Sequence, residues 1–112
     1  MVISRISTLF ALGAGLALAA LPARAQSPGL YYAWRAVETD VVTCIDRSTT
    51  ALTNEGLSNI QVEGNSVAGT TEDATAVFVC LQNPEAITVM IMVSSTNDDT
   101  AFTLRETLKE SF

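Results

Sequence analysis

The chain has 112 residues, of which 48% are hydrophobic, six are basic, twelve are acidic and none is histidine, for a formal net charge of −6. This length allows one small folded domain, and the acidic balance argues against binding to nucleic acid or to anionic lipid headgroups. The lack of histidine excludes the common catalytic and metal sites that depend on an imidazole.

The N-terminal segment has the pattern of a secretory signal peptide. An apolar stretch over residues 6–21 is followed by the tripeptide ARA at residues 23–25, which puts small residues at the −3 and −1 positions of a cleavage site. We expect cleavage after Ala25, so that residues 1–25 are the signal peptide and residues 26–112 are a single small periplasmic or secreted domain without a membrane segment. An uncleaved anchor is the alternative, and the apolar stretch is short for it, because a span needs about 20 residues.

Cleavage also changes the charge of the domain. It removes Arg5 and Arg24, so four basic residues remain against twelve acidic ones, and the net charge becomes −8. A domain of this charge is expected to stay soluble, but the charge does not identify a binding partner.

Two cysteines, Cys44 and Cys80, are the only ones in the chain. An even number of cysteines in an exported protein predicts a disulfide, and the spacing is not the C-x-x-C spacing of a redox pair. The bridge closes a loop of about 36 residues, which in the chain-entropy model stabilises the fold by about 3 to 4 kcal/mol.

The first predicted elements follow a short aromatic cluster. Tyr31, Tyr32 and Trp34 lie close together, and residues 34–42 are rich in Val and Thr, which favours a strand.

Residues 43–57 predict a helix, since small and apolar residues recur there at helical spacing. We expect Thr43 to be the N-cap, with Asp46 three residues later in place of the usual capping-box Glu. Gly56 is expected to end the helix in the left-handed conformation.

The rest of the chain predicts four strands and a last helix. Gly64-Asn65 is a hairpin turn, and the polar residues 96–99 supply helix-capping side chains. The expected strands are residues 59–63, 66–70, 74–81 and 86–95, and the expected helix is residues 100–112. This order, β-α-β-β-β-β-α, predicts an α+β two-layer sandwich, in which a mostly antiparallel sheet of about five strands has both helices on one face.

The most apolar part of the mature chain is residues 74–95, which has two interpretations, a membrane helix or a hairpin. Residues 82–85 are polar and include Pro84, which would break a helix, and the flanks are rich in β-branched residues. We therefore expect a hairpin, with Cys80 opposite Ile87.

Alternation along these two strands assigns their faces. The side chains expected on the core face, toward the first helix, are Ala74, Ala76, Phe78, Cys80, Ile87, Val89, Ile91 and Val93. The opposite face carries Thr75, Val77, Val79, Leu81, Thr88, Met90 and Met92, which are too apolar for a face left in water. Three covers stay open: the N-terminal arm with its aromatic residues, a second copy of the chain, or another exported protein or apolar ligand.

These features predict an exported non-catalytic domain that binds a protein, either itself or another, through an apolar sheet face. No catalytic, metal or cofactor site is expected. The alternatives are a small enzyme that uses carboxylates, from residues 72–73 or 98–99, and a binder of a small apolar ligand. The residues expected to make the contact are Tyr31, Tyr32, Trp34, Val77, Val79, Met90 and Met92.

Overall fold

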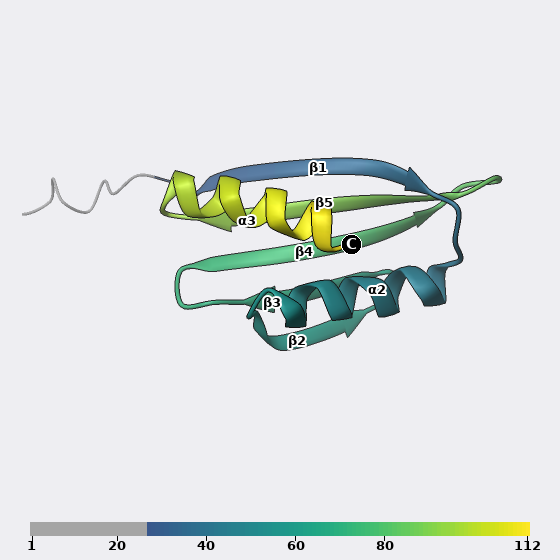
Figure 1. Cartoon of the computed structure of the whole chain (residues 1–112), viewed down its shortest axis with the longest axis horizontal. Coiled ribbons are helices and arrows are strands. Elements are labelled where there is room, and N and C mark those ends of the chain that lie inside the picture. The colour runs from purple at the N-terminus through teal and green to yellow at the C-terminus, as the bar shows by residue number, and fades with distance from the viewer. Residues whose placement is uncertain (1–26) are drawn as a thin grey trace, which may run out of the picture.

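The computed structural model describes residues 27–112, and the predicted signal peptide lies outside this range. The described chain forms a five-stranded sheet and two helices (Figure 1). In chain order the elements are β1 (Gly29–Val37), α2 (Val41–Asn54), β2 (Ser58–Glu63), β3 (Ser66–Thr70), β4 (Ala74–Gln82), β5 (Ile87–Ser95) and α3 (Asp98–Ser111). This is the predicted α+β fold with the predicted order of elements.

The strands lie in the sheet in the order β1-β5-β4-β3-β2, and each strand is antiparallel to its neighbours. Strands β2 to β5 follow one another as hairpins, while β1 pairs with β5 at the opposite edge from β2. The chain therefore crosses the sheet between β1 and β2, and α2 lies on this crossing (Figure 1).

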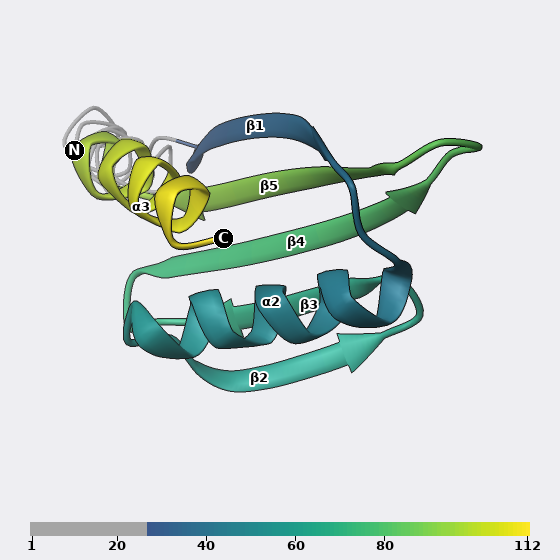
Figure 2. The ribbon, with the colours of Figure 1, turned by 45° about the vertical axis from the view of Figure 1, so that its right-hand side comes forward.

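Both helices cover the same face of the sheet (Figure 2). Helix α3 packs on β5 and β1, and α2 packs on β4, β3 and β2. Along β5 buried and half-buried residues alternate from Ile87 to Ser95, as expected of a strand with one covered face. The core predicted from the hairpin is confirmed, because all eight of its residues are buried.

The first strand and the start of the first helix differ from the prediction. The strand runs over Gly29–Val37 instead of residues 34–42, and the helix begins at Val41 instead of residue 43. Asp40 is the N-cap, with its side chain accepting a hydrogen bond of 2.7 Å from the Thr43 backbone N–H, so the prediction of Thr43 as N-cap was wrong. The cap overrides the strand preference of Val41 and Val42, which lie in the first helical turn.

The cap should make the stability of the domain depend on pH. The hydrogen bond from the Thr43 backbone N–H lowers the pKa of Asp40, so the ionised form stabilises the fold at neutral pH, and this contribution is lost as the pH falls through the lowered pKa. We expect the Asp40→Ser variant, which keeps an acceptor without the charge, to be less stable than the wild type at pH 7, by a difference that shrinks as the pH is lowered to about 2. Urea unfolding of both proteins at the two pH values measures this, and equal differences at both would contradict it.

The predicted end of the first helix is confirmed. Gly56 has a φ of 84°, in the left-handed region, and the Leu57 N–H donates to the Leu52 carbonyl at 3.0 Å. Leu57 is buried against the core, which returns the chain to the sheet for β2.

The hairpin of β4 and β5 forms as predicted, but its register is shifted by two residues. Cys80 lies opposite Val89 instead of Ile87, and the loop begins after Gln82. Asn83 sets this register, because its side chain accepts hydrogen bonds from the backbone N–H groups of Glu85 and Ala86. A shift of two residues leaves every side chain on its predicted face.

The predicted disulfide between Cys44 and Cys80 is present and joins α2 to β4. Both cysteines are fully buried, with their Cα atoms 6.2 Å apart. Within residues 27–112, neither helix has the length and apolar character needed to cross a membrane.

Candidate functional site

The face of the sheet opposite the helices is covered by no element in the part of the chain that the structure describes. The register places two rows of side chains across it, Tyr32–Met92–Val77–Ala68 and Trp34–Met90–Val79–Ser66. We call this surface the open face. It consists of Leu30, Tyr32, Trp34 and Ala36 of β1, Thr88, Met90, Met92 and Ser94 of β5, Thr75, Val77, Val79 and Leu81 of β4, Ser66, Ala68 and Thr70 of β3, and Ser58, Gln61 and Glu63 of β2.

The most exposed large hydrophobic side chains of the open face lie on β1, and two of them are aromatic. Tyr32 and Trp34 are 53% and 62% exposed, and their rings stack at 5.9 Å between centroids with planes 10° apart. The residues at the centre, Met90, Met92 and Val77, are half-buried by their neighbours on adjacent strands. Large apolar side chains that remain in contact with water over several strands are typical of a binding surface.

The structure brings together six of the seven residues expected to make the contact. Tyr32, Trp34, Val77, Val79, Met90 and Met92 share the open face. Tyr31 does not, because it precedes Tyr32 on the same strand and points to the helices, where it packs edge-on against Phe102 at 6.1 Å.

The N-terminal arm was one of three predicted covers for this face, and that hypothesis was wrong for the residues that carry its aromatic side chains. Residues 29–37 are strand β1, paired with β5 from Gly29 to Val37. The segment therefore extends the sheet sideways and adds its aromatic side chains to the open face.

Sequence reasoning missed Leu30 and Ala36 of β1 as members of the surface. Leu30 is 63% exposed and lies two residues before Tyr32. The alternation of Leu30, Tyr32 and Trp34 marks one face of a strand and could have revealed this part of the surface. The predicted strand began only at residue 34, so the alternation before it was not used.

The open face carries almost no charge. Glu63, at the β2 edge, is its one charged side chain among the described strand residues. Its other polar groups are neutral: the hydroxyls of Ser, Thr and Tyr32, the indole N–H of Trp34 and the amide of Gln61.

Both edges of the sheet are protected against pairing with another strand. At the β1 edge the Arg105 guanidinium donates to the Tyr32 carbonyl at 3.1 Å. At the β2 edge the register shifts between Ser58 and Gln61, and Asn59 has a φ of 53° in the left-handed region. Capped and bulged edges disfavour addition of a strand, so the face is a better contact surface than either edge.

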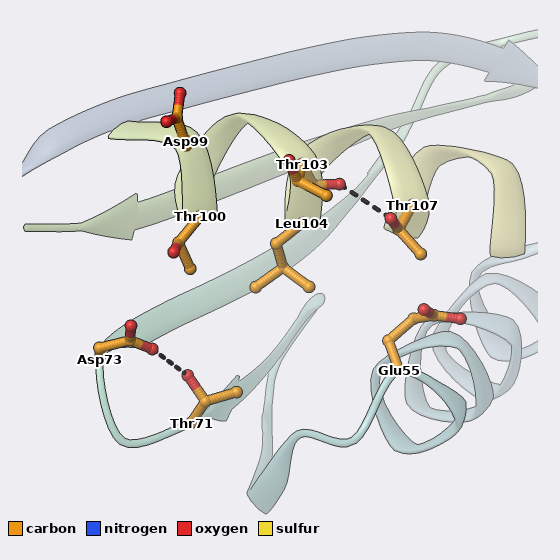
Figure 3. A pocket seen from close by; sticks show the side chains of 8 residues that line it. All are labelled: Glu55, Thr71, Asp73, Asp99, Thr100, Thr103, Leu104 and Thr107. Carbon is orange, nitrogen blue, oxygen red and sulfur yellow. Dashed lines mark hydrogen bonds between the residues drawn. The ribbon is translucent and has the colours of Figure 1, made fainter. Parts of the chain in front are cut away.

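The helix side has a second feature, an open cleft of about 480 Å³ between α3, the end of α2 and the β3–β4 turn (Figure 3). Leu104 points from α3 into the middle of it, and Asp73 accepts a hydrogen bond from the Thr71 hydroxyl at 3.1 Å. The residues that line the cleft are Glu55, Thr71, Asp73, Asp99, Thr100, Thr103, Leu104 and Thr107.

The carboxylates of this cleft are spread around it rather than gathered. Figure 3 shows Asp73, Asp99 and Glu55 on three separate elements, with Asp99 directed away from the cleft centre. No group of three or more Asp, Glu or Cys side chains within residues 27–112 is placed to hold a metal ion. Asp98 and Asp99 lie in the first turn of α3, where carboxylates favour the positive end of the helix dipole.

The cleft was not anticipated from the sequence. Thr100, Thr103 and Thr107 recur at helical spacing, but nothing local indicates that the β3–β4 turn lies beside them.

No protein-family model matches the chain, and a search of characterised proteins finds no significant match to it.

Proposed function

We propose that the domain is an exported, non-catalytic module that binds another polypeptide through the open face. The observation that carries this proposal is the apolar surface on the side of the sheet that no described element covers. Covering Tyr32, Trp34 and their neighbours removes apolar area from water, and each fully buried large side chain is worth about 1.5 to 3 kcal/mol.

Three further observations support this proposal. The buried disulfide between Cys44 and Cys80 is of the kind that forms in oxidising compartments. The aromatic and Met side chains of the open face are residue types enriched at protein interfaces. The carboxylates of the cleft are spread around it, and Asp99 is directed away from its centre (Figure 3), which favours binding over catalysis by a pair of close carboxylates.

A photo-crosslinking experiment in exporting cells tests the proposal. p-Benzoylphenylalanine replaces Met92, at the centre of the open face, and in a control it replaces Thr50, which is exposed on α2. We expect protein adducts from position 92 and none above background from position 50. The mature protein recovered from the same cells should begin at Gln26.

Equal labelling from both positions, or no adduct from position 92, would refute binding through the open face. A protein that keeps residues 1–25 would refute export by signal cleavage.

A further inference from the structure

We infer that the occupant of the open face is a second copy of this chain. The two copies pack with their open faces in contact, so that the helices lie on the outside of the dimer. This inference rests on the proposed function and identifies the polypeptide that the open face binds. Three properties of the face support it: its area, its lack of charge, and its relief.

The area of the open face is sufficient for a stable dimer. Strands β1, β4 and β5 have 9 residues each, or about 30 Å at ~3.3 Å per residue, and five strands are about 20 Å across. The face therefore measures about 600 Å² in projection. If β1 of each copy lies over the 5-residue β3 of the other, β2 stays outside the contact, which then covers about 450 Å² of each copy, or ~900 Å² for the pair. Protruding side chains have more accessible area than their projection, which brings the area removed from water to the ~1,000 Å² expected of a biological interface.

The distribution of charge allows two acidic copies to meet at this face. The described chain holds four basic and twelve acidic residues, and among its strand residues only Glu63 brings a charge to the open face. Contact between the two open faces leaves the remaining charges on the outside of the dimer in water, where salt screens their repulsion. A charged partner, in contrast, would find almost nothing on this face to pair with.

The relief of the face is complementary to itself. On the β1 side the face carries large side chains, Leu30, Tyr32 and Trp34, each more than half exposed, and we call this the high side. On the β3 side it carries the small side chains of Ser66 and Ala68, and we call this the low side. A two-fold axis parallel to the strands, between β5 and β4, lays β1 of each copy over β3 of the other. Met90 and Met92 of β5 then meet the Val side chains of β4 in the second copy, as an isologous interface requires.

Sedimentation equilibrium of the mature, disulfide-bonded domain tests the inference, with native mass spectrometry as a second measurement. We expect the wild type to be a dimer at micromolar concentration. Met90→Glu puts a carboxylate of each copy near the axis and should raise the dissociation constant at least ~100-fold, because like charges at an interface cost several kcal/mol. The control Thr50→Glu makes the same change of charge on exposed α2 and should leave the constant unchanged.

A second pair of variants tests which sides of the faces meet. Ala68→Trp raises the low side, and its side chain is partly exposed, so it should weaken the dimer about as much as Met90→Glu while the circular dichroism spectrum stays that of the wild type. Tyr32→Ala lowers the high side, and the double variant Tyr32→Ala with Ala68→Trp should recover part of the lost affinity. A dimer that Ala68→Trp leaves unchanged would overturn the arrangement of β1 over β3.

The outcomes separate this inference from the proposed function. A wild type that stays monomeric at about 100 µM, roughly a thousandfold above a sub-micromolar constant, overturns the second copy as occupant. If position 92 still crosslinks to a different protein, the proposed function stands without the dimer. A dimer that Met90→Glu leaves intact uses another surface and also overturns the inference.

Discussion

Replacing both Cys44 and Cys80 with Ala is expected to lower the free energy of unfolding by about 3 to 4 kcal/mol, because the bridge closes a loop of 36 residues and restricts the unfolded chain. The effect is large for a domain of this size, whose whole stability is about 5 to 15 kcal/mol. The bridge also joins α2 to β4 within the core, where both cysteines are fully buried. Urea unfolding followed by circular dichroism measures the loss.

Chemical reduction provides the control for this variant. A reductant should destabilise the wild type by a similar amount and should leave the double Ala variant unchanged. A double variant within about 1 kcal/mol of the wild type would show that the packing of α2 on the sheet holds the fold without the constraint.

Phe112→Ala is expected to lower the free energy of unfolding by about 3 to 5 kcal/mol, the usual cost of removing a buried Phe ring. Phe112 is 8% exposed, and its ring stacks on the fully buried Phe78 with 5.6 Å between centroids. The Arg47 guanidinium lies 4.2 Å from the ring centroid and donates from Nε to the Phe112 carbonyl at 3.1 Å. The ring thus connects α2, the sheet and the end of α3.

Phe102→Ala is the matched control, because it removes the same ring from α3, whose C-cap is Phe112, at a position that is 47% exposed. Phe102 packs against Tyr31 and lies under the Arg105 guanidinium, so we expect a real but smaller loss, less than about half that of Phe112→Ala. Equal losses from the two variants would contradict the placement of Phe112 in the core. Thermal unfolding of both proteins makes the comparison.

Several elements could be predicted because their signals are local. Gly56 ends α2 and Gly64 turns the β2–β3 hairpin, each with a positive φ. Alternation assigned the two faces of the β4–β5 hairpin, and this assignment survived a register error of two residues, since a side chain changes face only with a shift of one.

The errors arose where a side-chain contact or a distant strand decides the structure. Val41 and Val42 favour a strand, yet the Asp40 cap draws them into α2. The hydrogen bonds of Asn83 determine where β4 ends. The start of β1 depends on pairing with β5, which lies more than fifty residues later in the chain.

The sequence by itself determined that this protein has an α+β fold, one disulfide and a hairpin that is apolar on both sides, because periodicity, turn chemistry and cysteine number are properties of the chain. Only the tertiary structure decided that the second side of this hairpin stays open and gains the aromatic residues Tyr32 and Trp34. The physical reason is strand order. Strand β1 pairs with β5 at the edge of the sheet through backbone hydrogen bonds, which do not depend on the identity of the side chains. No local pattern therefore reveals that β1 extends the sheet instead of covering the open face.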